Sequence, residues 1–260
     1  VYESRYLSGV VAGMKLNEMI QKGEVKKDNC KIGYVGAFPY AEVISGFTSF
    51  YLGVKSVCDS ATMEVKYTNS WASFDLEKEC AEQLIADGCV LISQHADTTG
   101  APTACEAKKV PCVGYNIDMI PTAPDAALTS ATINWGPYYT YAVQSVIEGT
   151  AIDTDWSKGV KDGADAITEL NDKTVAKGTK EKVEEAQKGI EDGTIHVFDT
   201  SKFTVGGKTL EELVESGDED ATKLQSYIKD GYFHESDVAG GMTSAPAFTF
   251  IIDGIDSITK

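Results

Sequence analysis

The clearest pattern in the chain is a short apolar stretch followed directly by a helix-like repeat. Residues 31–36, KIGYVG, are rich in β-branched and aromatic side chains and end on a glycine, which predicts a buried strand. From residue 40 to 57 the apolar positions recur at steps of three and four, which predicts one buried helix face. The tight loop between them carries Phe38 at its tip. Ligands of open α/β sheets usually bind at such loops, at the carboxyl ends of strands.

The same alternation continues along the chain. Further strands are predicted at residues 63–68, 89–94, 110–115, 127–133 and 163–170, and helices at 3–21, 75–87, 101–109, 136–149 and 180–191. The inward face of the 75–87 helix is expected to hold Leu76, Cys80, Leu84 and Ile85. Repeats of this length predict the α/β class with a doubly wound parallel sheet, whose right-handed crossovers bring the strand-to-helix loops to one edge.

After residue 194 the pattern becomes weaker. A short strand is predicted at 195–199, and the chain is polar and rich in glycine from 201 to 242, with one helix at 222–229. A last strand, AFTFII, is predicted at 247–252.

Charge and composition narrow the functional classes. A net charge of -17 over 260 residues disfavours nucleic acid and anionic membrane surfaces, both of which attract clustered lysine and arginine. No stretch is apolar and long enough to cross a bilayer. The chain opens on Val1 inside a predicted helix and has no basic leader, so we expect a fragment or a trimmed product, any signal peptide having been removed.

Six cysteines occur in the first half of the chain, none in a C-x-x-C pair: Cys30, Cys58, Cys80, Cys89, Cys105 and Cys112. These spacings disfavour zinc, and buried thiols are the simplest interpretation. One or two disulfides are compatible with the same pattern.

Five predicted strand ends deliver polar and aromatic side chains to one edge. They are Phe38, then Asn69 and Trp71, then His95 and Asp97, then Asn116 and Asp118, and finally Asn134, Trp135 and Tyr138. Such an edge suits a flat heteroaromatic ligand, because rings stack on its faces while amides and carboxylates bond its nitrogen-bearing rim.

Each of these residues also has a structural explanation. Phe38 could cap the core, Asp118 could serve as a turn residue, and Trp135 and Tyr138 could pack on a neighbouring element. His95 has no second metal-ligating residue nearby, so a hydrogen-bonding or structural role is favoured over a metal site. Trp71 lies in a polar loop, and this favours a binding role for it.

Catalytic motifs are absent from the sequence. It contains no G-x-S-x-G, H-E-x-x-H or G-x-x-x-x-G-K-[ST] pattern, and the Gly33–Gly36 segment lacks the third glycine of a dinucleotide fingerprint. Asp97 and Asp118 form the only plausible acidic pair for a hydrolase. Binding without catalysis, metal or cofactor is therefore the simpler prediction.

Several segments, taken in order, resemble a known family. They are ESRYLSGVVAG, KIGYVGAFPYAEVISGF, YTNSW, ISQHAD, GYNIDM and LTSATINWGPYY. Together they are similar to the basic membrane protein family of substrate-binding lipoproteins, which serve ABC importers of purine nucleosides and related bases. The resemblance covers residue 3 to about 199 and implies a type I periplasmic-binding fold, two α/β lobes closing on a ligand.

In that family roughly a hundred more residues precede the first helix, as two lobes of ordinary size require. The resemblance thus implies a complete second lobe and a partial first lobe. Residues 1–28 would be a first-lobe remnant, 29–133 the second lobe, 134–157 a crossing with a first-lobe helix, 158–200 the return to the second lobe, and 201–260 a C-terminal extension.

The resemblance also implies roles for individual residues. Trp71 matches the aromatic that stacks on the base, and Asp97 to Gly100 match the loop near the sugar or base edge. Asn116 and Asp118 match a paired-aspartate loop whose first member is here asparagine. Asn134 lies near a position where nucleoside-binding members carry lysine. This departure favours a free purine such as adenine over a ribosyl or 6-oxo ligand.

The expected function is therefore a non-enzymatic, extracytoplasmic purine carrier that delivers its ligand to an ABC permease, held at the membrane by a lipid anchor outside this chain. Two alternatives are a ligand-sensing regulatory domain of the same fold and, less favoured, a nucleoside hydrolase.

Overall fold

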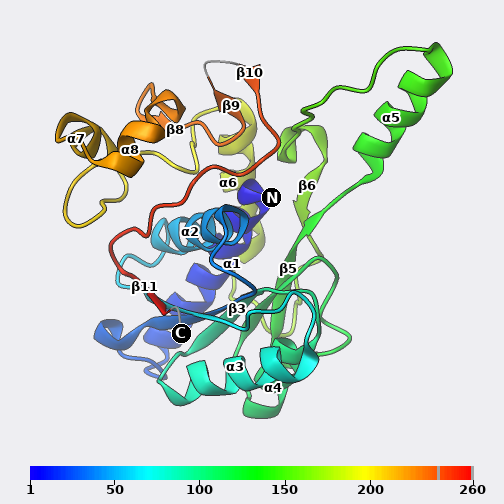
Figure 1. Ribbon diagram of the computed structural model, residues 1–260. Helices are drawn as coiled ribbons and strands as arrows, with labels where there is room; N and C mark the ends of the chain where they lie inside the picture. The colour runs from blue at the N-terminus through cyan, green and yellow to red at the C-terminus, as the bar shows by residue number, and fades with distance from the viewer. Residues whose placement is uncertain (239–240, 259–260) are drawn as a thin grey trace.

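Seven strands form one twisted sheet in the computed structural model, which describes residues 1–238 and 241–258 (Figure 1). The strand order is β11-β2-β1-β3-β4-β5-β6. Their bounds are β1 Lys31–Gly36, β2 Thr62–Tyr67, β3 Leu91–His95, β4 Cys112–Tyr115, β5 Ala127–Ile133, β6 Asp165–Ile167 and β11 Ile255–Ile258. All neighbours pair in parallel except β6, which runs antiparallel to β5. The prediction of a doubly wound parallel α/β sheet is confirmed, with one antiparallel strand, β6, at its edge.

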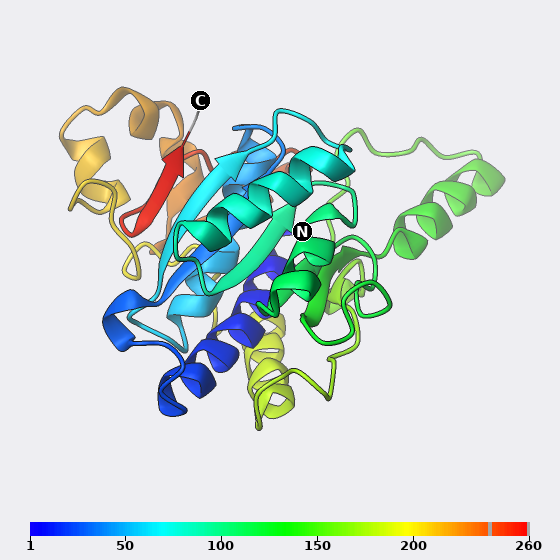
Figure 2. The same ribbon diagram turned by 90° about the horizontal axis from the view of Figure 1, so that it is seen from below.

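Helices cover both faces of the sheet, as Figures 1 and 2 show together. One face carries α1 Tyr2–Gln21, α2 Ala41–Lys55 and α6 Thr179–Asp192, and the other carries α3 Phe74–Ala86 and α4 Gly100–Lys108. Each face has its own apolar core. Ile32, Leu91 and Leu128 point to the α1–α2 side, whereas Val35, Ile92 and Ala127 point to the α3–α4 side. Strand residues alternate between the two cores because successive side chains of a strand point to opposite faces.

Helices α1 and α2 touch through their backbones at glycines. A Cβ on Gly53 would lie 2.1 Å from the carbonyl oxygen of Tyr6, and one on Gly9 would lie 2.1 Å from that of Phe50. Only a residue without a side chain fits at such a crossing. Helix α3 on the opposite face is less deeply packed than its pattern predicts. Leu84 is buried, but Leu76 is 44% exposed, so its predicted inward orientation is wrong.

The region after residue 194 differs most from the sequence prediction. Residues 195–199 form only an isolated bridge from Asp199 to Tyr232, and the 222–229 helix is replaced by α8 Glu219–Lys223, a 3-10 turn (Gln225–Tyr227) and a short hairpin, β7 Ile228–Lys229 with β8 Tyr232–Phe233. Helix α7 Leu210–Glu215 and the β9 Asp237–Val238 and β10 Gly241–Met242 pair were not predicted. The predicted extension 201–260 also spans 239–240 and 259–260, which lie outside the described residues.

The AFTFII segment is buried without being a strand. Phe248 stacks on Phe198 with ring centroids 4.4 Å apart, and Phe250 and Ile252 are buried. Its apolar alternation therefore reflects packing onto a core. The sheet pairing falls three residues later, where β11 joins β2.

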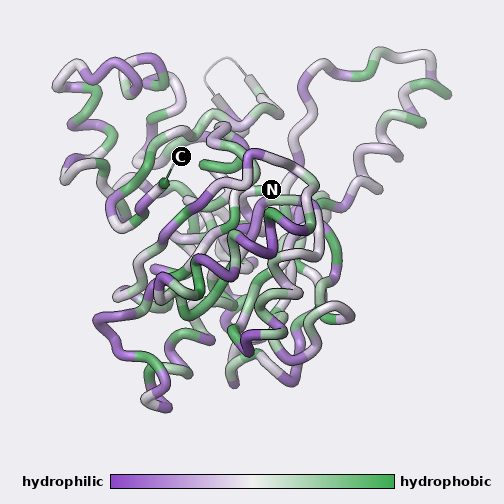
Figure 3. The backbone as a smooth tube through the Cα atoms, turned by 60° about the horizontal axis from the view of Figure 1, so that its bottom comes forward, coloured by the Kyte–Doolittle hydropathy of each residue, from purple (hydrophilic) through white to green (hydrophobic). Residues whose placement is uncertain are grey.

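Helix α5, Gly136–Glu148, projects away from the sheet on two extended connections (Figure 1). Its apolar residues lie on this arm far from the two cores (Figure 3), and Val146 and Ile147 are 70% and 74% exposed. The remaining 3-10 turns, Lys27–Asn29 and Val160–Asp162, connect α1 to β1 and precede β6.

Candidate functional site

Four adjacent strand ends bring together a group that we call the strand-end rim: Phe38, Tyr40, Trp71, His95, Asp97, Tyr115 and Asn116. Strands β2, β1, β3 and β4 are consecutive neighbours, so the residues that follow them meet at one edge. The Phe38 and Tyr40 rings stack with centroids 5.0 Å apart, and Phe38 lies 5.7 Å from Trp71. Phe38 and Trp71 are partly buried and Tyr40 is 54% exposed, so the rim presents aromatic surface to solvent.

The polar part of the rim lies beside these rings. The Asn116 side-chain amide donates to Asp97 Oδ1 at 3.2 Å, and the Asp97 backbone N–H donates to the Trp71 carbonyl oxygen at 2.7 Å. Burial raises the pKa of Asp97, and the hydrogen bond from Asn116 opposes that shift. Asn116 adopts a left-handed backbone conformation, φ 66°, at the end of β4. The predicted neighbours Trp71, Asp97 and Asn116 are thus brought together.

His95 forms the floor of the rim. Its ring is fully buried, with centroids 4.7 Å from Tyr115 and 6.3 Å from Trp71. Burial, with the nearby Arg5 guanidinium, lowers the pKa of His95 to about 3, although the Glu42 carboxylate 3.8 Å away opposes the shift. A neutral imidazole therefore packs beneath these rings, and a ligand role for His95 remains a prediction.

Arg5 reaches the rim from beneath, and sequence reasoning missed it. Its side chain is fully buried, donates from Nη1 to the Gln94 carbonyl oxygen at 2.7 Å, and lies over the Tyr115 ring at 4.0 Å. A signal was present in the sequence. Arg5 lies on the same face of α1 as the buried Ala12 and Leu16, where a cation requires a specific partner.

The predicted residues after β5 form a second group. The Asn134 side chain bridges the loop, with Nδ2 donating to the Gly163 carbonyl oxygen at 2.8 Å and Oδ1 accepting from the Gly136 N–H at 3.0 Å. Trp135 packs edge-on to Tyr138, which lies 5.3 Å from Trp156. These side chains line a hollow of about 380 Å³ at the base of the α5 arm. Trp135 and Tyr138 thus pack against aromatic side chains of the same region, and a ligand role for them remains a prediction.

Asn69 and Asp118 occupy exposed turns. Asn69 has a left-handed backbone, φ 55°, after β2. The carboxylate of Asp118 accepts from the Ile120 N–H at 2.9 Å, the behaviour of a turn aspartate. A ligand role for either remains a prediction.

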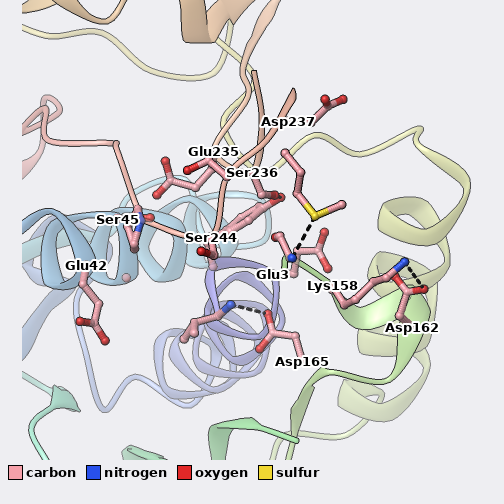
Figure 4. Close-up of a pocket in the computed structure, with 18 residues that line it drawn as sticks. Glu3, Glu42, Ser45, Lys158, Asp162, Asp165, Glu235, Ser236, Asp237 and Ser244 are labelled. Atoms are coloured by element: carbon pink, nitrogen blue, oxygen red, sulfur yellow. Dashed lines mark hydrogen bonds and ion pairs between the residues drawn. The ribbon is translucent and has the colours of Figure 1, made fainter. Parts of the chain in front are cut away.

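A larger hollow of about 490 Å³ adjoins the rim at Glu42 and Gly46 of α2 (Figure 4). Its walls carry carboxylates from α1, α2, the 157–165 loop and the chain near residue 236: Glu3, Glu42, Asp162, Asp165, Glu235 and Asp237. The Glu235 carboxylate accepts from the backbone N–H groups of Ala247 and Phe248, and burial raises its pKa. Sequence reasoning missed this hollow because its walls come from segments far apart in the chain.

The chemistry of these groups favours recognition of a neutral or cationic polar molecule. Aromatic faces accept a planar ring, and carboxylates accept hydrogen bonds from N–H or O–H donors. Across residues 1–238 and 241–258, no three His, Cys, Asp or Glu side chains cluster in a way that could hold a metal ion. No helix within those ranges combines the length and apolar character needed to cross a bilayer.

Comparison with known proteins relates the chain to substrate-binding proteins of ABC transporters. A family model described as "ABC transporter substrate-binding protein PnrA-like" matches residues 1–199. A purine-binding protein of Brucella abortus is 32% identical over 197 residues, 76% of this chain and 53% of that protein. A putative ABC transporter glucose-binding protein of Haloferax volcanii is 30% identical over 204 residues, 78% of this chain and 49% of that protein. The chain thus spans about half the length of these relatives.

Among solved structures, a solute-binding protein of an ABC transporter system from Aeropyrum pernix is similar with a TM-score of 0.64 and 18% identity, covering 85% of this chain and 70% of that one. At this identity the likeness shows the fold, which is that of periplasmic-binding-protein-like solute receptors.

Proposed function

The chain belongs to the Bmp family of PnrA-like ABC transporter substrate-binding proteins, and we propose on that basis that it binds a purine for an ABC importer outside the cytoplasm. The ligand would be a free base such as adenine or a purine nucleoside. It would lie at the strand-end rim and be handed to a membrane permease. The protein would be held at the membrane by a lipid anchor outside this chain.

The observation that carries the proposal is that aromatic rings and hydrogen-bonding side chains lie next to each other at one edge of the sheet. Phe38 and Trp71 lie 5.7 Å apart, and Asp97 and Asn116 meet at 3.2 Å beside them. Stacking supplies affinity for any base, and a carboxylate or amide distinguishes its edge. The purine-binding relative from Brucella supports this choice of ligand.

Adenine is favoured over inosine or guanosine. Asn134 offers an amide near a position where the family resemblance implies a lysine in nucleoside-binding members, and its two polar atoms are already bonded within the β5–α5 loop. No cation is then supplied to a 6-oxo group or a ribose from this position.

The α5 arm supports the proposed division into lobes. We place residues 1–28 and 134–157 at the first lobe and 29–133 and 158–200 in the second. An apolar helix face with side chains 70% and 74% exposed is typical of a surface that packs against another element.

A sugar is the second candidate ligand. The acid-lined hollow beside Glu42 offers several carboxylate acceptors, which suit the hydroxyl groups of a hexose. The Haloferax relative, named as a putative glucose-binding protein, is consistent with it.

Isothermal titration of the complete natural protein with adenine, guanosine, inosine and glucose tests both candidates. We expect adenine to bind with a micromolar or tighter Kd and glucose to give no heat. Heat from glucose alone would favour the second candidate, and heat from none of the four would contradict the proposal. Incubation with inosine should yield no hypoxanthine, and turnover would instead favour the hydrolase alternative.

A further inference from the structure

Two cysteine thiols face each other inside the α1–α2 core. Cys30 Sγ and Cys58 Sγ lie 3.9 Å apart, and each residue is 2% exposed. Both are reduced in this structure. A disulfide requires its sulfur atoms about 2.05 Å apart, so closing the bond needs a combined movement of about 2 Å.

The two cysteines mark the two ends of one βα unit. Cys30 directly precedes β1, and Cys58 lies three residues beyond the end of α2, while the loop with Phe38 and Tyr40 lies between these elements. The backbone is already fixed around the pair, because the Thr62 N–H donates to the Cys30 carbonyl oxygen and the Ala61 N–H to that of Cys58. The bond would therefore join two segments whose backbones are held by hydrogen bonds on either side of the pair.

Neighbouring groups favour the thiolate form of Cys58 over that of Cys30. The Cys30 and Cys58 sulfur atoms are within hydrogen-bonding distance of each other, and Ser60 Oγ lies 3.7 Å from Cys58 Sγ. The Cys30 thiol and the Ser60 hydroxyl lower the pKa of Cys58, whereas the Cys58 thiol and burial raise the pKa of Cys30. Thiolates, and not thiols, attack disulfides.

We propose that Cys30 and Cys58 are a modification site at which an external disulfide, of the glutathione class, oxidises the pair to an intramolecular disulfide that clamps β1 to the end of α2. The Cys58 thiolate attacks one sulfur of the external disulfide and releases a thiolate. Cys30 then loses its proton to water, attacks the Cys58 sulfur and releases the second thiol. Two protein thiols are oxidised and one external disulfide is reduced to two thiols.

The supply of oxidant rests on the proposed function, because disulfides form and persist mainly outside the cytoplasm. The pairing itself rests only on the distance and on the positions of the two residues. Since both thiols are buried in the folded chain, we expect the external disulfide to reach Cys58 when the α1–α2 core opens transiently, or before that core closes during folding.

The test is to refold the 260-residue chain in a mixture of reduced and oxidised glutathione and then to count thiols under denaturing conditions. We expect the six thiols of the reduced chain to fall to four. A tryptic digest without reductant should contain the peptide 28–31 joined to the peptide 56–66. The oxidised chain should melt about 10 °C higher than the reduced chain, because the bond links residues 28 positions apart and so restricts the unfolded chain.

The double variant Cys30→Ala/Cys58→Ala should keep the same Tm with and without the glutathione mixture. Cys89→Ala, which removes another buried cysteine, should keep the redox-dependent rise. Six free thiols after refolding, or a cross-link between Cys105 and Cys112 that leaves Cys30 and Cys58 free, would overturn the proposal. No ligand is used, so a failure of purine binding would leave these results unchanged.

Discussion

Trp71 is the residue on which the proposed binding mode depends most. Its ring centroid lies 5.7 Å from that of Phe38 and 6.3 Å from that of His95, just beyond the end of β2. The loop around it is polar, so the ring is held by neighbouring strand ends instead of by its own sequence neighbours. Its partial exposure leaves ring surface for a ligand.

Replacing this ring should weaken ligand binding more than it weakens the fold. For Trp71→Ala in the complete protein we expect adenine affinity to fall roughly 5- to 150-fold, because stacking of a base on an aromatic ring contributes about 1–3 kcal/mol. Isothermal titration measures the change. Phe74→Ala removes a 42% exposed ring at the start of α3 and serves as the control, with affinity unchanged. Equal losses in both variants would contradict the assignment.

His95 should make the fold sensitive to mild acid. Its pKa is lowered to about 3 in the folded chain, against about 6.5 when unfolded. Between these two values the unfolded chain binds the proton and the folded chain does not, so the free energy of unfolding falls as pH falls from 6.5 toward 3. One such group contributes up to about 1.4 kcal/mol per pH unit. Arg5, Glu42, Trp71 and Tyr115 face this ring.

Urea unfolding at pH 7, 6 and 5 measures this dependence. The variant His95→Phe keeps an aromatic ring at the site but cannot titrate, so its stability should change less over that range. His196→Phe, at an exposed histidine near the C-terminal end of α6, should retain the slope of the parent chain. If His95→Phe and the parent chain showed the same slope, the buried neutral imidazole would not be the cause.

At the scale of elements, the α1–α2 pair fixes one face of the sheet. The two helices cross where Gly53 meets the Tyr6 backbone and Gly9 meets the Phe50 backbone, both at 2.1 Å for an added Cβ. Backbone atoms in packed helices cannot move aside as side chains can. The close crossing therefore depends on glycine at these positions.

Gly53→Ala should destabilise the chain by about 1–3 kcal/mol or more, because the new methyl group must separate the helices. Gly189→Ala on α6 is the matched control. Its methyl group would meet the end of the Ile195 side chain at 2.6 Å, which can rotate, and alanine favours the helix by about 1 kcal/mol. Urea unfolding compares the two variants. A Gly53→Ala chain as stable as the Gly189→Ala chain would show that the crossing is looser than described.

At the scale of the whole molecule, two cores hold the sheet and its helices, while the α5 arm lies apart from both. Val146 and Ile147 are 70% and 74% exposed, so they have little burial to lose within residues 1–238 and 241–258. The stability of this chain should therefore be independent of the apolar face of the arm.

The paired substitution Val146→Lys with Ile147→Lys should change the free energy of unfolding by no more than about 0.5 kcal/mol, as surface substitutions usually do. Phe50→Ala in the α1–α2 core should cost about 3–5 kcal/mol. Thermal unfolding of the three chains is the measurement. A large loss from the arm substitution would mean that the arm packs against the rest of this chain.

The sequence by itself determined the strand and helix order through residue 192 and the edge at which four loops meet. Strict apolar periodicity is a local property, and parallel connectivity leaves few ways to arrange the elements. The same reasoning predicted that Trp71, Asp97 and Asn116 would be neighbours. It failed for Ile195–Asp199 and for AFTFII, because apolar alternation marks burial against any surface and does not require a strand partner.

Only the tertiary structure decided which residues meet across long separations. Arg5 beneath Tyr115, the acid-lined hollow beside Glu42, and the division of the predicted site into a rim and an arm all join segments distant in the chain. The spacing of residues in the sequence does not predict such contacts, because they depend on how helices and loops pack once the sheet has formed. The 3.9 Å approach of Cys30 and Cys58 has the same origin: they are 28 positions apart in the chain, and the packing of α2 against the sheet brings them together.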